Sequence, residues 1–358
     1  MHMADALLSP AVGGIMWLVS AGTIAYCSHR VREESDDRTI PLMGVLGAFI
    51  FAAQMINFSI PATGSSGHLG GGLLLTILLG PWAAFLVISS VLVVQALFFA
   101  DGGLLALGCN IFNLGFIPAF IVFPLIYLKI LGKEPDRSRR SVAVMVSALV
   151  GLQLGPFSVV LETWLSGVSA LPFTTFLLLM QPIHLGIGLM EGIVTIAVVT
   201  FIHQARPELL GILPKTASRN SFPLSALIVT FLATALLTGG VLSRFASRNP
   251  DGLEWAIAGV TKEKGVKGPE LGVHGTLASL QEKTALLPDY SFSKPAEAKS
   301  APPNPAGGER KESRERVGAG SAGVLGSLLT LALLFVTGLL LKKRITPPSC
   351  KASEDGLP

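Results

Sequence analysis

The first three residues, Met1, His2 and Met3, form a pattern that can bind a metal ion without help from the rest of the chain. A free α-amine, the amide nitrogen of residue 2 and the near ring nitrogen of a histidine at position 2 close two adjacent chelate rings, which place three nitrogens in one plane. The amide must lose its proton, so only a metal that binds nitrogen strongly fits, and square-planar nitrogen sites suit Ni²⁺ and Cu²⁺. Because protons are released, we expect binding to weaken at low pH.

A fourth nitrogen is expected from His68, which lies in the glycine-rich run 64–72. Glycines allow backbones to approach closely, so an N-terminal segment could pack beside this loop. Plainer readings stay open on the residues alone, because a histidine after Met1 is common by chance and a histidine in such a loop can simply cap a helix. The run is not a phosphate loop, since no Gly-Lys-Ser/Thr follows it.

This chelate requires that Met1 stays in the mature protein. No basic region precedes the first apolar run, and Asp5 stands where a secretory signal would carry Lys or Arg. His2 is also too bulky for the usual removal of an initiator methionine. We therefore expect the N-terminus to remain unprocessed.

The composition places these residues in a membrane protein. Half of the residues are apolar and 14% are charged, whereas an average soluble domain has about 25% charged residues. Spans are expected where apolar runs approach the roughly 20 residues that cross a bilayer as a helix. The predicted spans are 11–27, 42–58, 69–79, 82–99, 104–130, 142–165, 183–202, 222–241 and 322–341. The predicted fold is an all-α, polytopic integral membrane bundle of about nine transmembrane helices, seven plus two.

Basic clusters set the predicted orientation. They follow the first, fifth, seventh and last spans, and the positive-inside rule assigns all four to the cytoplasmic side. Splitting the third and fourth spans at Gly80-Pro81 satisfies every loop, whereas fusing them places the basic segment 129–140 outside. We therefore expect the N-terminus and the His68 loop outside and the C-terminus in the cytoplasm.

The chain is predicted to contain two membrane modules in tandem. Residues 1–210 form a seven-helix module, and residues 220–345 form a two-helix module with an outward loop at 243–321. The run 249–255 predicts a turn that leads into a short helix. After Ser291 the loop is rich in Pro, Ala, Gly, Lys and Glu, which predicts a disordered linker.

Polar residues within the spans are candidates for function because their burial in a bilayer is costly. Gln54 and Asn57 lie one helical turn apart and could hydrogen-bond the metal ligands, or could equally tie helices together. Ser66 and Asp101 are further candidates for this supporting role, although Asp101 also reads as part of an outer turn. The remaining polar residues are read first as contacts between helices, with His184 and Glu162 as a candidate pair: Asn110, Asn113, Glu162, His184 and Glu191.

Three stretches resemble the CbiM/NikM family, the substrate-binding components of energy-coupling-factor (ECF) cobalt and nickel importers. They are residues 1–10, the stretch from 57–61 through 68–71, and the stretch from 95–103 through 110–113, which together span about the first 205 residues. Residues 250–256, with the sequence PDGLEWA, resemble the partner CbiN/NikN component, fused here to the first module. The resemblance implies that Met1 and His2 supply nitrogens and that His68 completes the metal square. Asp101 resembles the nickel branch more closely, since the cobalt branch is expected to carry His there.

The resemblance implies the substrate-specific component of an ATP-driven importer that captures Ni²⁺ or Co²⁺ outside a bacterial plasma membrane. Its expected partners are a membrane coupling subunit, two cytoplasmic ATPase subunits and the lipid bilayer; no nucleic acid and no organic cofactor are expected. The chain has no Walker A sequence, so ATP must be hydrolysed elsewhere and the chain is not expected to be an enzyme. Alternatives are a stand-alone permease driven by an ion gradient and an intramembrane metalloenzyme, although His184 and Glu191 do not have HExxH spacing.

Overall fold

The computed structural model describes residues 2–34, 38–133, 135–210, 222–262, 272–292 and 305–342, and the side chains of the last range from Arg316 onward. Met1 lies outside the described residues, as does 293–304, within the segment predicted to be a disordered linker. Apart from one small hairpin, the regular secondary structure of the described chain is helical, which confirms the predicted all-α membrane fold.

Within these described ranges, seven helices are long and apolar enough to cross a membrane. Their bounds are α1 Pro10–Glu34, α4 Pro81–Phe99, the continuous α5–η2–α6 Leu107–Leu131, α7 Arg137–Ser166, α8 Phe173–Ala205, α9 with η4 Leu224–Phe245, and α12, of which Arg316–Leu341 is the candidate span. The other two predicted spans are the shorter α2 (Thr39–Gln54) and α3 (Gly72–Leu79). At 8 residues, α3 rises only about 12 Å, well short of a hydrocarbon core of about 30 Å.

Proline shapes two of these helices. Pro118 and Pro124 lie inside η2 (Phe112–Tyr127), which has wide π-type turns that accommodate a residue without an N–H group. Helix α8 begins at Phe173, earlier than the predicted residue 183, because it continues through Pro182. In membranes such prolines are tolerated, since neighbouring groups satisfy the freed backbone carbonyls.

A two-stranded antiparallel hairpin, β1 (Phe58–Ile60) and β2 (Ser65–Gly67), carries the histidine loop. It was not predicted, because three-residue strands are too short to show an alternating pattern. The turn between the strands uses left-handed conformations at Ala62 and Gly64. His68 follows β2 directly, so the hairpin fixes where this side chain begins.

The second module packs along the first. Helices α9 and α12 contact α2, and small residues bring the backbones close: a Cβ at Gly326 would lie 1.9 Å from Phe51. The predicted turn and short helix at 249–255 are present, as α10 (Gly252–Thr261). The outward segment also contains α11 (Val273–Thr284) and η5 (Pro288–Tyr290).

The predicted extent of the disordered linker was wrong at its C-terminal end. Helix α12 begins at Pro305, so 305–321 is helical and not part of a disordered linker. The segment 309–316 consists mainly of Glu, Lys and Arg, which are good helix formers. The helix therefore extends through this polar segment, before the apolar span.

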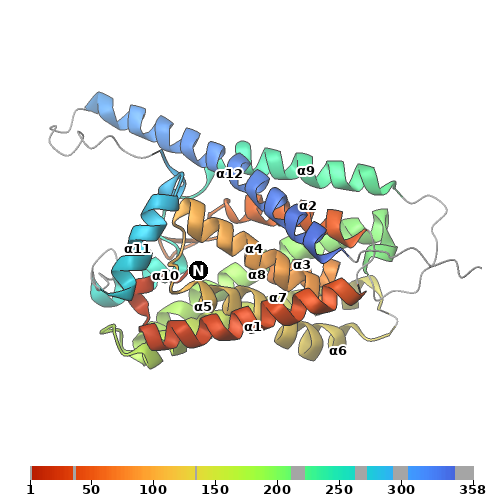
Figure 1. Ribbon diagram of the computed structural model, residues 1–358, viewed down its shortest axis with the longest axis horizontal. Helices are drawn as coiled ribbons and strands as arrows, with labels where there is room; N and C mark the ends of the chain where they lie inside the picture. Colours follow the sequence, from red (N-terminus) through yellow and green to blue (C-terminus); the bar gives the residue numbers. More distant parts are fainter. Residues whose placement is uncertain are drawn as a thin grey trace, which may run out of the picture.

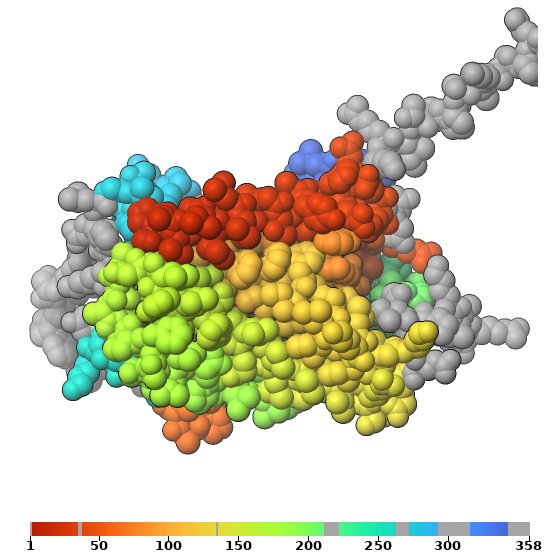
Figure 2. Space-filling view, turned by 90° about the horizontal axis from the view of Figure 1, so that it is seen from below, coloured from red at the N-terminus to blue at the C-terminus, as the bar shows by residue number. Residues whose placement is uncertain are grey.

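The helices run roughly along the long axis of the molecule, and α10 and α11 gather near the N-terminus at one end, here called the loop end (Figure 1). Figure 2 shows α1 lying along one face beside α5–η2 and α7. Large apolar side chains are exposed on the outer helices, including Leu18, Leu178 and Leu340 at 76%, 67% and 77%. A water-facing surface would not carry so many exposed apolar groups, so these faces contact lipid.

Candidate functional site

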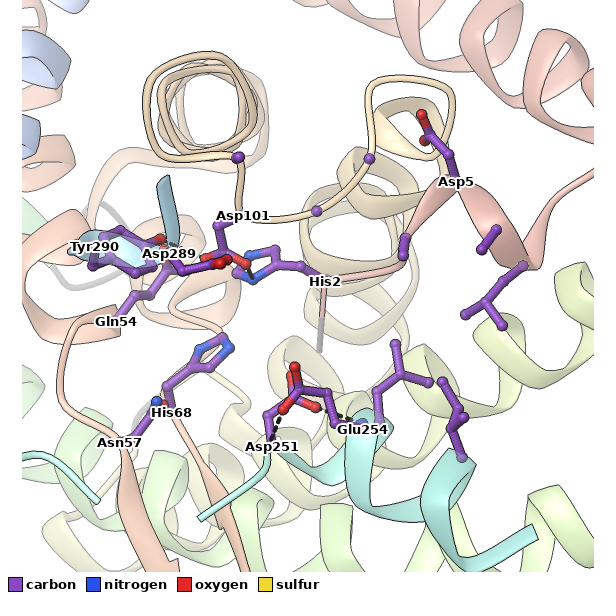
Figure 3. A pocket seen from close by; sticks show the side chains of 18 of the residues that line it. His2, Asp5, Gln54, Asn57, His68, Asp101, Asp251, Glu254, Asp289 and Tyr290 are labelled. Atoms are coloured by element: carbon purple, nitrogen blue, oxygen red, sulfur yellow. Dashed lines mark hydrogen bonds and ion pairs between the residues drawn. The ribbon is translucent and has the colours of Figure 1, made fainter. Parts of the chain in front are cut away.

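A cavity of about 780 Å³ opens at the loop end and is lined by both modules. The first module contributes His2, Asp5, Gln54, Asn57, His68 and Asp101, and the second contributes Asp251, Glu254, Gln281, Asp289 and Tyr290. Figure 3 shows the side chains of His2 and His68 converging here from different elements, with Asp251 and Glu254 facing them from the start of α10. The cavity therefore brings together residues that are far apart in the sequence.

The N-terminal segment is held in place by backbone contacts of Met3. The amide of Met3 donates to Oδ1 of Asn110 at 2.8 Å, and the Asn110 amide donates back to the Met3 carbonyl at 3.3 Å. The amide of Gly103 also donates to that carbonyl, at 2.8 Å. Asn110 was read as a contact between helices; it instead fixes the position of the N-terminal segment.

Glycines allow this segment to lie so close. Gly102 has a φ of +80°, in the left-handed region, and a Cβ there would lie 3.1 Å from Cβ of His2. A Cβ at Gly103 would lie 1.8 Å from Oδ1 of Asp5. The Asp-Gly-Gly sequence at 101–103 is thus explained by the close approach of the N-terminus.

His2 is held by Asp101. Its ring nitrogen Nδ1 lies 3.1 Å from Oδ1 of Asp101, and its Nε2 is buried with no hydrogen-bond partner among the described residues. Asp101 also accepts a hydrogen bond from the hydroxyl of Tyr290. Burial alone would raise the pKa of Asp101, but the neighbouring His2 and the hydroxyl of Tyr290 hold it well below its usual value. Asp101 is therefore a carboxylate that orients the His2 ring.

His68 has the form of a metal-binding imidazole. Its ring stacks on that of His2, with centroids 5.1 Å apart and planes 10° apart. Its Nδ1 lies 3.0 Å from the carbonyl of Leu69, which can only accept, so Nδ1 carries the proton and Nε2 the lone pair. Burial lowers the pKa of His68 to about 3, so the ring is neutral. A backbone acceptor on one ring nitrogen is the usual way of orienting a ligating histidine.

The loop after His68 is anchored to α8 by Glu191. The two carboxyl oxygens of Glu191 accept hydrogen bonds from the amides of Gly70, at 2.6 Å, and Gly71, at 3.0 Å. Gln54 donates to the carbonyl of Gly70 at 2.8 Å. Glu191 was predicted only as a polar residue between helices, and its position within a span was the one signal that pointed to it.

The other predicted supporting residues have different surroundings. Asn57 lines the cavity, and its Oδ1 is buried without a partner among the described residues. Ser66 does not line the cavity: its hydroxyl donates to the carbonyl of Asn249 at 2.7 Å and its amide to that of Pro250 at 2.8 Å. Ser66 therefore attaches the second module to the hairpin. That contact could not be read from a single serine in the sequence.

The second module covers the cavity with a capped turn. The Asp251 carboxylate accepts from the amide of Glu254 at 2.8 Å, and the Glu254 carboxylate accepts from the amide of Asp251 at 3.2 Å, which is a capping box. Gln281 donates to the carbonyl of Gly102 at 2.7 Å, and His274 lies 2.9 Å from the carbonyl of Leu8. The Asp-x-x-Glu spacing was visible in the sequence, but nothing there indicated the contacts of α11.

Two buried residues expected to pair are separately bonded. Glu162 accepts from Asn113 at 2.9 Å and from Ser158 at 3.3 Å. His184 donates from Nδ1 to the carbonyl of Met180 at 2.8 Å. The suggested His184–Glu162 contact is therefore wrong.

In the part of the chain that the structure describes, no three His, Cys, Asp or Glu side chains lie close enough to hold a metal ion by themselves.

The helical bundle and its apolar exterior define a multi-pass membrane protein, and a polar cavity lies at one end of it. Residues 2–209 match the family model for the CbiM cobalt uptake substrate-specific transmembrane region, and residues 225–343 match the PDGLE domain. The chain belongs to the CbiM family, and its similarity to named metal transport proteins makes it a component of a metal transporter and not an enzyme.

Individual relatives agree with this assignment. The chain is 27% identical over 323 residues to the fused nickel transport protein NikMN of Rhodobacter capsulatus, covering 84% of this chain and 91% of that protein. It is 35% identical over 210 residues to a putative NikMN of Archaeoglobus fulgidus, covering 59% and 68%. A crystal structure of a truncated transition metal transporter has a TM-score of 0.51 at 28% identity and covers 57% of this chain and 99% of that one.

Proposed function

We propose that this chain is the substrate-specific component of an ECF-type, ATP-driven importer and captures Ni²⁺ or Co²⁺ at the extracytoplasmic face. The observation that carries the proposal is the convergence of His2 and His68, stacked at 5.1 Å on the wall of a polar cavity at one end of a membrane bundle. Two imidazoles beside a carboxylate suit a divalent ion of the nickel and cobalt type, which prefers nitrogen ligands.

The proposed ligands are the α-amine of Met1, the amide and ring of His2, and the ring of His68. For Nδ1 of His2 to bind the ion, its contact of 3.1 Å with Asp101 must open, so the metal replaces this hydrogen bond. Gln54, Asn57 and Asp101 line the same cavity and would orient the ligands. Ser66 acts less directly, through the second module.

The proposed arrangement in the membrane follows from the basic clusters. The loop end lies outside, together with the N-terminus, and the C-terminus is cytoplasmic in a bacterial plasma membrane. Residues 1–210 form the metal-binding module, and 220–345 form a two-helix module whose outward segment covers the site. A membrane coupling subunit and two cytoplasmic ATPase subunits complete the importer.

Nickel is slightly favoured over cobalt as the ion. A planar set of four nitrogens suits Ni²⁺. The relative from Rhodobacter capsulatus, whose match covers 84% of this chain, is named a fused nickel transport protein. Other relatives are named cobalt transport proteins, so both ions are tested below.

The sharpest test adds Ala-Ala-Pro before Met1. The addition leaves both histidines in place but separates the amine from His2, and the proline has no amide N–H that could replace it in a chelate, so Ni²⁺ and Co²⁺ affinity in the purified chain should fall at least about 100-fold, or about 2.7 kcal/mol. The control is His29→Gln, which changes an exposed histidine of α1 that contacts Glu33. Unchanged affinity in the extended chain would refute the chelate.

The pH dependence gives an independent check. Because binding must release protons from the amine and the amide, affinity should fall as pH falls. The pKa of His68 is about 3, so this histidine stays neutral in mildly acidic solution and does not cause the loss. Isothermal titration in buffers of different ionisation enthalpy measures the protons released. Binding without proton release would contradict the amide ligand.

Reconstituted vesicles separate the importer from a stand-alone permease. Vesicles that hold this chain alone, with a proton or sodium gradient, should not accumulate Ni²⁺. Adding the coupling and ATPase subunits with ATP should start uptake. Gradient-driven accumulation by the chain alone would favour the permease.

A further inference from the structure

A second buried histidine, His184 of α8, has the chemical form of a metal ligand but no assigned role. Its side chain is 1% exposed. Its Nδ1 donates to the carbonyl of Met180 at 2.8 Å, which leaves the lone pair on Nε2. Nε2 is buried and has no hydrogen-bond partner among the described residues. A buried nitrogen in this state is costly unless something binds it.

This ring lines a small space beneath the cavity. The space has a volume of about 10 Å³, close to that needed by one water molecule. Its walls include Gly67, Leu114, Leu152 and Ile187, so it is largely apolar. Among the described residues that line this space, His184 has a buried polar side-chain atom without a hydrogen-bond partner.

The small space and the large cavity share two lining residues, His68 and Asp251. His68 therefore stands between them, and an ion bound to its ring is next to the space that His184 lines. On the chain, His184 lies on the same helix as Glu191, which anchors the His68 loop.

The second module closes this space. Gly252 packs directly on the ring, since a Cβ at that position would lie 3.1 Å from Cε1 of His184 and 2.8 Å from Cγ2 of Ile183. A side chain at 252 would therefore push the turn off α8 or fill the space. The glycine of the Asp-Gly-Leu-Glu turn is needed for this contact.

We propose that His184 is the receiving ligand of a second, inner metal position, to which Ni²⁺ or Co²⁺ passes from the outer chelate through His68. The inference rests on the proposed capture of these ions. Nε2 of His184 and the ring of His68 supply two nitrogens, and the carboxylate of Asp251 supplies an oxygen when the turn moves. No bond other than metal–ligand bonds is made or broken.

The incompleteness of this position suits a transfer step. An ion in transit must be bound well enough to enter and weakly enough to leave. The described residues do not hold three such ligands in binding geometry, so the inner position binds more weakly than the four-nitrogen chelate. The Met180 carbonyl keeps the His184 ring oriented without occupying Nε2.

The experiment measures Ni²⁺ binding in two backgrounds of the full chain, with Ni²⁺ alone as the probe. In the native background, His184→Gln should still bind one Ni²⁺ within about threefold of the unchanged affinity, which shows that it folds. In the background with Ala-Ala-Pro before Met1, the residual weak binding should fall about tenfold or more on His184→Gln, because this variant removes a ligand, whose loss is no smaller than that of a group that only supports one. The control is His203→Gln, a histidine of the same helix that lies far from the space.

Each outcome bears on one proposal. Equal residual binding in the His184→Gln and His203→Gln chains, or no residual binding in the extended chain, overturns the inner position and leaves the outer chelate intact. Loss of one Ni²⁺ in the native background on His184→Gln, with unchanged thermal unfolding, also overturns it, because His184 would then belong to the outer site. Failure of the unchanged chain to bind Ni²⁺ would reject the proposed function itself.

Discussion

The two histidines of the candidate site are held by different parts of the molecule. His2 is fixed through Asp101 and the segment 98–103, which the second module contacts through Tyr290 and Gln281. The His68 loop is fixed through Glu191 and Gln54, both on helices of the first module. The second module also contacts the hairpin before His68, through Ser66, so a movement of this module would disturb the supports of both histidines.

The largest effect is expected on removal of His68, the histidine whose loop is anchored to α8. His68→Ala should lower Ni²⁺ affinity at least about 100-fold, because a lost ligand exceeds the 10–100-fold loss typical of residues that only support one. Isothermal titration of the purified chain measures it, with His203→Gln as the control. An affinity within tenfold of the unchanged chain would mean that the fourth ligand is another group.

The support of the His68 loop should have the next largest effect. Glu191→Gln replaces one carboxyl oxygen by an NH₂ group, which cannot accept a hydrogen bond. One backbone N–H of Gly70 or Gly71 is then buried without a partner, at a cost of about 1–3 kcal/mol in stability. Ni²⁺ affinity should fall about 10-fold.

The matched control is Glu162→Gln, which changes another buried carboxylate that bonds Asn113 and Ser158 and not the His68 loop. Equal losses in the two variants would mean that Glu191 acts only through general stability of the bundle.

The support of His2 by the second module should have a smaller effect. Tyr290→Phe keeps the ring stacked on Phe99, at 5.2 Å between centroids, but removes the hydroxyl that donates to Asp101. Asp101 keeps its contact with His2, so affinity should fall only about 2- to 5-fold, less than the full 1.5–3 kcal/mol of a hydrogen bond to a charged group. Tyr26→Phe, on the exposed side of α1, is the control. A loss as large as that of Glu191→Gln would make the two supports equivalent.

The smallest effect on metal affinity is expected where the hairpin attaches to the second module. Ser66→Ala removes the hydroxyl that donates to Asn249, worth about 0.5–1.5 kcal/mol. Hydrogen exchange of the amides at 249–255 should quicken, while Ni²⁺ affinity changes less than about threefold.

Ser89→Ala is the control, because that buried hydroxyl bonds only within its own helix, to Phe85. Unchanged exchange at 249–255 in the Ser66 variant would show that the backbone contact from Ser66 to Pro250 is sufficient.

The bundle could be predicted because apolar runs of membrane length are a local property. Each of the nine predicted spans contains a helix, and the turn before α10 follows from a local Asp-x-x-Glu capping pattern. Helix α2 ends at Gln54, however, so the prediction that Asn57 lies one helical turn further on was wrong: Asn57 lies in the connection between α2 and β1. The boundaries were less predictable. Helix α8 continues through Pro182, and α3 is only 8 residues long. The ends of these two helices depend on the helices packed around them and not on their own sequences alone.

His2, His68, Asp101, Gln54 and Asn57 could be selected in advance because polar residues in an apolar chain are few and stand out. Their arrangement could not. That Asn110 holds Met3, that Glu191 anchors Gly70, and that Tyr290 reaches Asp101 are contacts between residues distant in sequence, for which local patterns carry no signal.

Residue types and their local order were thus enough to indicate a membrane bundle and to predict a metal site among its polar residues. Only the packed helices decided which side chains meet and which contacts hold each histidine. The physical reason is that hydrophobic length and capping act within a few residues, whereas the position of a ligand is set by hydrogen bonds and close glycine contacts across the whole fold.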